Sequence, residues 1–103
     1  MLPEIRVLLD RLSVTTPEGA ESSIAWSDVY RVHASREDLM TTTSRFLYFD
    51  FDFGEVVEVN DRMSGFEEML SELGRYLPLP PDYKQQVDAT QCSEPPITLY
   101  SRP

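Results

Sequence analysis

The sequence predicts an α+β domain of about seven short strands and one amphipathic helix, spanning residues 1–103 as a single domain. Its length of 103 residues is that of one domain. Apolar and polar residues alternate between Arg45 and Val59, as expected for paired strands. Apolar residues then recur at helical spacing between Phe66 and Leu77. Hydrophobic residues make up 41% of the chain, which favours a folded domain over a disordered one.

The first segment, residues 4–15, fits two periodicities. Ile5 and the three leucines of this segment recur at helical spacing. Ile5, Val7 and Leu9 also alternate with polar or other residues as in a strand. No helix-capping pattern precedes Ile5, and Asp10-Arg11 suits a tight turn or bulge. We therefore predict two strands, with a single helix as the alternative.

Residues 16–19 have the composition of a turn, with a proline and a glycine. Residues 22–34 then predict two strands, because alternate residues on each side of Ser27-Asp28 share a face. The break falls at Ser27-Asp28, since these short polar side chains bond to nearby backbone amides. Residues 35–38 are expected to form a charged loop.

Residues 45–59 carry the strongest local signal and predict a hairpin that turns near Phe53-Gly54. One face of its first strand is apolar and comprises Leu47, Phe49, Phe51 and Phe53. The other face is expected to be solvated and acidic, and comprises Phe46, Tyr48, Asp50 and Asp52.

Ser64-Gly65-Phe66-Glu67 has the form of a capping box, which predicts a helix start at this point. Pro78 ends the helix, because proline lacks an amide donor and disfavours helix at the residue before it. Residues 79–96 are rich in proline and predict an irregular crossing, in which Pro78–Pro81 acts as a stiff connector. Residues 97–100 form the last predicted strand.

Charge and hydropathy exclude several classes of partner. The chain has 18 acidic and 9 basic residues, a net charge of −9, and a pI near 4.4. Nucleic acids and anionic membranes are therefore poor partners. The longest apolar run, Phe46–Phe49, falls far short of the roughly 18–20 residues of a membrane helix. No basic region followed by an apolar stretch is visible near Met1, so a cytoplasmic location is expected.

Motifs for metal or cofactor chemistry are incomplete, and we expect no cofactor. Asp52-Phe53-Gly54 lacks the glycine-rich loop and strand lysine that a kinase needs around this triplet. A calcium loop from Asp50 needs glycine at its sixth position and glutamate at its twelfth, where Glu55 and Asp61 stand. The single cysteine, Cys92, can form neither an internal disulfide nor a cysteine-based zinc site.

His33 is the only histidine, and acid–base chemistry near neutral pH would depend on it. A triad with a serine and Asp28 or Asp38 is conceivable, but no G-x-S-x-G nucleophile motif is present. The simplest position for His33 is the solvated face of a strand. Trp26 is expected to anchor the core or its rim; the alternative is an indole partly exposed among its polar neighbours, where it would be an interface anchor.

Four segments resemble a group of small uncharacterised bacterial proteins with a Trp-x-Asp-[Ile/Val] turn and a pleckstrin-homology-like fold: Ile24–Val32, Asp38-Leu39-Met40, Phe46–Phe53 and Gly65–Leu70. The resemblance spans most of the chain. It implies a strongly bent antiparallel sheet or partly open barrel, closed at one end by the helix. Lipid-binding members use basic residues in the first hairpin loop, whereas residues 15–21 here contain two glutamates and no base. The resemblance therefore does not imply phosphoinositide binding.

We predict a soluble, non-enzymatic module that binds a protein, in a narrower version as an acidic inhibitor or immunity-type protein. The candidate interface residues are Trp26, Phe46, Tyr48, Asp50 and Asp52. The alternative is a small-molecule-binding protein or small enzyme that uses His33 and nearby carboxylates in a pocket between sheet and helix. A homodimer through an exposed strand edge is compatible with both.

Overall fold

The computed structural model describes residues 3–51 and 54–102. Within these ranges the chain forms seven strands, two α-helices and two short 3-10 helices. In chain order these are β1 (Glu4–Val7), β2 (Arg11–Thr15), β3 (Glu21–Ala25), η1 (Trp26–Asp28), β4 (Val29–Asp38), β5 (Thr43–Phe51), β6 (Glu55–Asn60), α1 (Phe66–Glu72), η3 (Leu73–Arg75), α2 (Tyr83–Asp88) and β7 (Ile97–Ser101).

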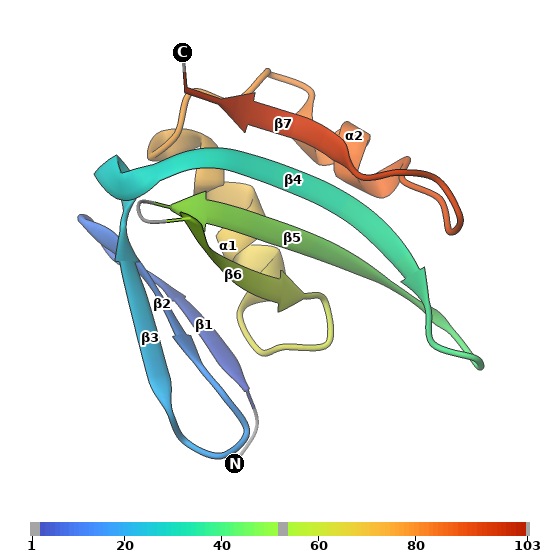
Figure 1. The fold of residues 1–103 in the computed structure, drawn as a ribbon, viewed down its shortest axis with the longest axis horizontal. Helices are drawn as coiled ribbons and strands as arrows, with labels where there is room; N and C mark the ends of the chain where they lie inside the picture. Colours follow the sequence, from blue (N-terminus) through green and yellow to red (C-terminus); the bar gives the residue numbers. More distant parts are fainter. Residues whose placement is uncertain (1–2, 52–53, 103) are drawn as a thin grey trace.

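The strands form two antiparallel sheets (Figure 1). The first sheet has the order β1-β2-β3, and the second has the order β6-β5-β4-β7. The chain passes from one sheet to the other through η1, at the break expected at Ser27-Asp28. The α+β class is confirmed, but across residues 3–51 and 54–102 the strands form two sheets and no closed barrel.

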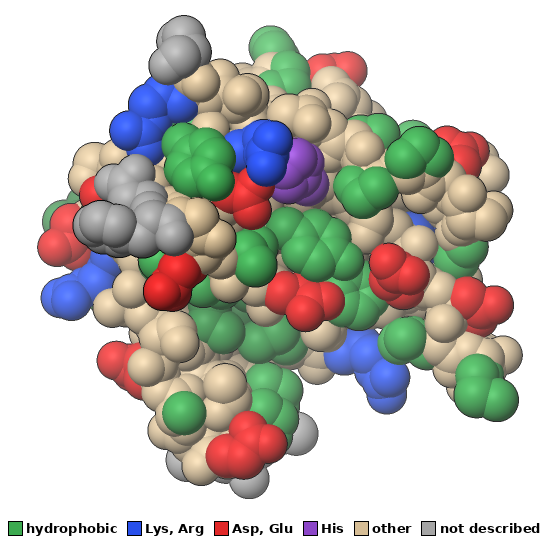
Figure 2. All heavy atoms as spheres, viewed as in Figure 1, with side chains coloured by type: hydrophobic (Ala, Val, Ile, Leu, Met, Phe, Trp, Pro, Cys, Tyr) green, Lys and Arg blue, Asp and Glu red, His purple; other side chains and the backbone are tan. Residues whose placement is uncertain are grey.

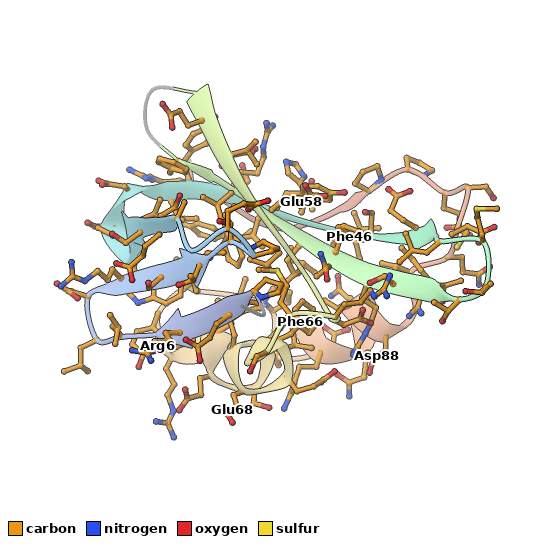
Figure 3. The ribbon with its side chains drawn as sticks, turned by 90° about the horizontal axis from the view of Figure 1, so that it is seen from below. Arg6, Phe46, Glu58, Phe66, Glu68 and Asp88 are labelled. Atoms are coloured by element: carbon orange, nitrogen blue, oxygen red, sulfur yellow. The ribbon has the colours of Figure 1, made fainter. Side chains whose placement is uncertain are left out.

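The core lies between the sheets and the helices. The side chains that are almost fully buried come from both sheets and from α1, η3 and α2, and include Leu12, Val32, Leu47, Phe49, Val59, Phe66, Met69, Leu73 and Val87. In Figure 1, α1 lies behind the sheets. Figure 3 shows α1, with Glu68 on its outer side, on one side of the four-stranded sheet and Glu58 on the other. The opposite face of this sheet, called the outer face below, is therefore not covered by α1.

The amino-terminal hairpin confirms two strands over residues 4–15 and shows that the helical alternative is wrong. Ile5 pairs with Val14 and Val7 pairs with Leu12. Leu9 is 89% exposed at the turn, so it does not join the buried stripe that a helix would have needed.

The charged loop expected at residues 35–38 is wrong, because β4 continues to Asp38. Glu37 pairs with Ser44 and Asp38 pairs with Thr43, so the hairpin to β5 extends beyond its apolar part. Charged side chains are compatible with this end of the strand because Glu37 and Asp38 are exposed to water.

The capping box at Ser64 is also wrong, although the helix begins where expected. The residue before the helix is Gly65, with a φ of 89°, and no side chain caps the first turn. The backbone of Ser64 bonds to β1 instead: Ile5 N donates to Ser64 O at 2.8 Å, and Ser64 N donates to Pro3 O at 3.0 Å. Because the Ser64 backbone bonds to β1, the chain enters the helix through the left-handed backbone conformation of Gly65, which glycine adopts without steric cost.

The segment expected as an irregular crossing contains α2. Its buried residues, Tyr83 and Val87, are one helical turn apart. The Tyr83 hydroxyl donates to Leu70 O at 2.5 Å, which attaches α2 to the end of α1. Two apolar residues were too weak a pattern to predict this helix. Within the described ranges, no helix has the length and apolar character needed to span a membrane.

Candidate functional site

The outer face of the four-stranded sheet brings together most of the residues singled out in the sequence. Strand alternation directs every second side chain of β4, β5 and β6 to this face. His33 pairs with Tyr48 on β5 and with Thr98 on β7, while Tyr48 pairs with Glu58 on β6. Figure 2 shows the histidine on this face, between basic and hydrophobic side chains and with acidic side chains nearby.

The outer face contains a shallow groove with a volume of about 450 Å³. The groove runs across all four strands of the sheet. Its lining residues are Arg31, His33, Tyr48, Asp50, Val56, Pro96 and Thr98. The pocket expected between sheet and helix for the small-enzyme alternative is thus misplaced, because His33 lies on the opposite side of the sheet from α1.

Asp50 lies at the base of this groove and is only 9% exposed. Arg31 Nε donates to Asp50 Oδ2 at 2.7 Å, and His33 Nε2 is 3.1 Å from the same oxygen. The expectation of a solvated acidic face is therefore wrong for Asp50. The carboxylate tolerates burial because pairing with Arg31 offsets the cost of removing it from water.

His33 connects this ion pair to β7. Its Nδ1 is 3.4 Å from Thr98 Oγ1, so a hydroxyl, an imidazole and a carboxylate lie in a row across three strands. The sequence suggested Asp28 or Asp38 as the carboxylate partner, whereas the structure places Asp50 there. Strand alternation places Arg31 and His33 on the same face of β4. Asp50 lies next to them only because β4 pairs with β5 in this register.

Phe46 and Tyr48 form an aromatic pair next to the groove. Their ring centroids are 6.2 Å apart, and the ring planes differ by 15°. The Ser35 hydroxyl donates to the Tyr48 hydroxyl at 3.3 Å. Both rings are half-buried, so each presents apolar surface to solvent on the outer face.

Exposed carboxylates lie around this aromatic pair. Glu37 is at the end of β4, and Glu58 is on β6 opposite Tyr48. Neither carboxylate forms an ion pair with another residue that the structure describes. Asp52, which the sequence assigned to the same face, lies outside the described residues.

Trp26 is the one candidate that the structure places in the core, at 7% exposure. Its ring stacks on Tyr76 with centroids 4.9 Å apart, and its Nε1 donates to Leu8 O at 2.9 Å. The core position expected for Trp26 is confirmed, and the alternative of a partly exposed indole is not found. Trp26 therefore joins the first sheet to the segment after α1.

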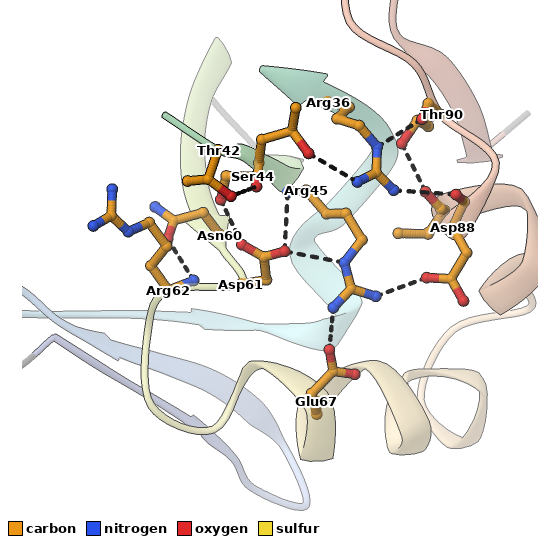
Figure 4. A network of polar contacts seen from close by, with 12 residues as sticks. Arg36, Thr42, Ser44, Arg45, Asn60, Asp61, Arg62, Glu67, Asp88 and Thr90 are labelled. Carbon is orange, nitrogen blue, oxygen red and sulfur yellow. Dashed lines mark hydrogen bonds and ion pairs between the residues drawn. The ribbon is translucent and has the colours of Figure 1, made fainter. Parts of the chain in front are cut away.

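A second polar cluster centres on Arg45, away from the groove (Figure 4). Arg45 Nε donates to Asp61 at 3.1 Å and Nη1 donates to Asp88 at 2.7 Å, while Nη2 pairs with Glu67. The Ser44 hydroxyl donates to Asp61 at 2.5 Å. These contacts tie β5 to the loop before α1, to α1 and to α2, which indicates a structural role.

The two central groups of this cluster have shifted pKa values. Burial by itself lowers the pKa of Arg45, but hydrogen bonds to Asp61, Glu67 and Asp88 outweigh it and hold the pKa above its ordinary range. Burial by itself raises the pKa of Asp61, but hydrogen bonds from Ser44 and Arg45 hold it below its ordinary value. Both groups therefore stay charged near neutral pH.

Comparison with known proteins returns no match to any family model, any curated protein or any solved structure. Among the residues that the structure describes, no three histidine, cysteine or acidic side chains are placed to hold a metal ion together.

Proposed function

We propose that this chain is a non-catalytic interaction module that binds a basic protein through the outer face of its four-stranded sheet. The observation that carries the proposal is the stacked Phe46–Tyr48 pair, placed on a sheet face that α1 does not cover and flanked by the exposed carboxylates of Glu37 and Glu58. Aromatic anchors inside a polar rim are typical of protein interfaces.

Charge supports a basic partner. The net charge of −9 steers positively charged surfaces toward the chain and repels acidic ones. Glu37 and Glu58 are exposed at the rim, where they can pair with lysine or arginine. An acidic inhibitor or immunity-type protein that covers a basic active site is a narrower form of the proposal, in which association slows as salt rises.

A pleckstrin-homology-like fold is the finer assignment that we propose. Support comes from the three-stranded and four-stranded antiparallel sheets, joined through the Trp26–Asp28 turn and packed on α1. The first hairpin loop of the structure is residues 8–10, between β1 and β2, and the next loop is residues 16–20, between β2 and β3. Neither contains a basic residue, which disfavours a phosphoinositide ligand.

The test is capture of partners from a source-cell lysate at low and moderate salt, followed by mass spectrometry. We expect a stoichiometric protein that the wild type retains at low salt and that Phe46→Ala and Tyr48→Ala lose. Leu9→Ala is the matched control, because it removes an exposed apolar side chain from the turn between β1 and β2, outside the four-stranded sheet. Retention of the same protein by all variants, or no retained protein, would contradict the proposal.

Small-molecule binding is a second candidate, favoured by the row of Thr98, His33 and Asp50 in the groove. It predicts that a small molecule co-purifies with the wild type and is lost from His33→Ala without unfolding. Native mass spectrometry detects the ligand, and circular dichroism checks the fold. A wild-type chain of unmodified mass, free of ligand, would contradict this candidate.

A further inference from the structure

β6 is the last strand of the four-stranded sheet, and it borders the outer face. Its only strand partner among the described residues is β5. An edge strand leaves every second backbone N–H and C=O group directed away from its sheet. The free edge of β6 therefore has hydrogen-bonding capacity next to the proposed interface.

Two contacts identify which backbone groups point outward. Asp61 N donates to Arg45 O at 3.1 Å, so this pair bonds across the hairpin. Asn60 bonds elsewhere: its O accepts from Met63 N at 3.1 Å, and its N lies 3.4 Å from Met63 Sδ. Since bonded and non-bonded pairs alternate in an antiparallel ladder, the N–H and C=O groups of Val56 and Glu58 point to the free edge.

The side chains of the same two residues lie on the outer face. Val56 is 54% exposed, which is unusual for a valine and places apolar surface beside the groove. Glu58 is exposed next to Tyr48 on β5. A strand added to β6 would thus meet one apolar side chain, one carboxylate and four backbone groups.

The other sheet edges are less suited to this role. The edge of β1 is already bridged by the backbone of Ser64. The exposed side chains of β3 are Glu21, Ser22 and Ser23, and this strand is in the other sheet. β7 follows directly on Pro95-Pro96, and proline restricts strand pairing at that end.

We propose that an extended, basic segment of the protein partner adds to the free edge of β6. In an antiparallel addition, residues of the segment two positions apart lie opposite Val56 and Glu58. An apolar side chain fits opposite Val56 and a lysine or arginine fits opposite Glu58. A second copy of this chain is disfavoured, because it would bring a further net charge of −9 and its own carboxylates to this edge. The inference rests on the proposed function, since it describes how the same partner is held.

The probe is a synthetic peptide with threonine at every second position and lysine and valine alternating between them. We expect it to bind the wild type and to slow hydrogen exchange of the Val56 and Glu58 amides. Replacing its lysines with glutamate should abolish binding.

Val56→Pro is the decisive variant. Proline removes the outward N–H of this residue and leaves the ladder between β5 and β6 intact, because proline is tolerated where the amide faces away from the sheet. We expect at least about tenfold weaker peptide binding, since proline also blocks close approach of a strand. Val56→Thr keeps the amide and the branched side chain, and should bind within about twofold of the wild type.

Failure of the inference is distinguishable from failure of the proposed function. No peptide binding to the wild type, or equal binding to wild type and Val56→Pro, would overturn strand addition. If Val56→Pro still captures the lysate partner while Phe46→Ala does not, the partner binds through the outer face and strand addition to β6 is wrong. If the peptide protects the amides of Val56 and Glu58 but no protein is captured, an extended segment does add to the edge of β6 and the proposed function is wrong.

Discussion

Arg45 joins three carboxylates from three different segments, and its guanidinium lies 5.4 Å from the centre of the Phe66 ring. Its side chain is 17% exposed, so solvent screens these contacts only partly. We expect Arg45→Ala to lower the free energy of unfolding by about 2–4 kcal/mol, because Asp61 loses a partner in a half-buried position.

Arg75→Ala is the matched control for this prediction. Its side chain is 75% exposed and its contact to Glu72 is 3.9 Å long. The control should change the free energy of unfolding by less than about 0.5 kcal/mol. Urea unfolding of both variants checks the difference, and equal midpoints would show that the Arg45 cluster adds no stability.

The lowered pKa of Asp61 predicts that the stability of the fold depends on pH. Its pKa in the folded chain lies below the ordinary value of 3.8, because Ser44 and Arg45 stabilise the charged form. A lowered pKa stabilises the fold at all pH values above the ordinary one, and this contribution is lost as pH falls through the folded value. Asp61→Asn should therefore destabilise at pH 7 by about 1–2 kcal/mol, with a difference from wild type that shrinks below about pH 4.

The comparison is made by urea unfolding of wild type and Asp61→Asn from neutral to strongly acidic pH. Ser44 provides a check on the cause, because Ser44→Ala removes one of the hydrogen bonds to the carboxylate. It should reduce the same pH-dependent contribution without abolishing it. A difference between wild type and Asp61→Asn that stays constant with pH would contradict this account.

At the scale of elements, the entry to α1 depends on Gly65 rather than on a serine cap. Gly65 has a φ of 89°, and a Cβ at this position would overlap the backbone oxygen of Ile5. We expect Gly65→Ala to cost about 2–4 kcal/mol, from backbone strain and overlap together. Gly19 has the same φ with open space around it, so Gly19→Ala should cost only about 1–2 kcal/mol.

Ser64→Ala separates the two explanations of the helix start. A capping box would lose about 1 kcal/mol with this change. Because the Ser64 contacts to β1 are made by its backbone, we expect a loss below about 0.5 kcal/mol. Thermal unfolding of Gly65→Ala, Gly19→Ala and Ser64→Ala measures the order of their stabilities. A Ser64→Ala variant as unstable as Gly65→Ala would show that the serine side chain caps the helix.

The elements also show how far periodicity can predict this fold. β5, β6 and the start of α1 were predictable, because long alternating or helical patterns bury one face. The extension of β4 to Asp38 and the presence of α2 were not, since both depend on partners. Asp38 pairs with Thr43 on a solvent-exposed end, and α2 is held by the Tyr83 hydroxyl on Leu70.

At the scale of the whole molecule, the net charge of −9 predicts a salt effect on stability. Like charges on a compact chain repel, and salt screens this repulsion. We expect the melting temperature at pH 7 to rise with added sodium chloride. The effect should be much smaller near the pI of 4.4, where the net charge approaches zero. A melting temperature that falls with salt at pH 7 would mean that attractive pairs such as Arg45–Asp61 dominate.

The sequence by itself determined the α+β class, most strand positions, the main helix and the acidic character of the chain, because alternation and net charge are local or additive properties. It also placed Phe46, Tyr48 and Asp50 on one strand face. Only the tertiary structure decided that Asp50 is buried against Arg31 and His33, that Trp26 is a core residue, and that β6 pairs with no strand but β5 among the described residues. Each of these depends on which strands pair and in what register, and strand alternation alone does not specify a strand's neighbour.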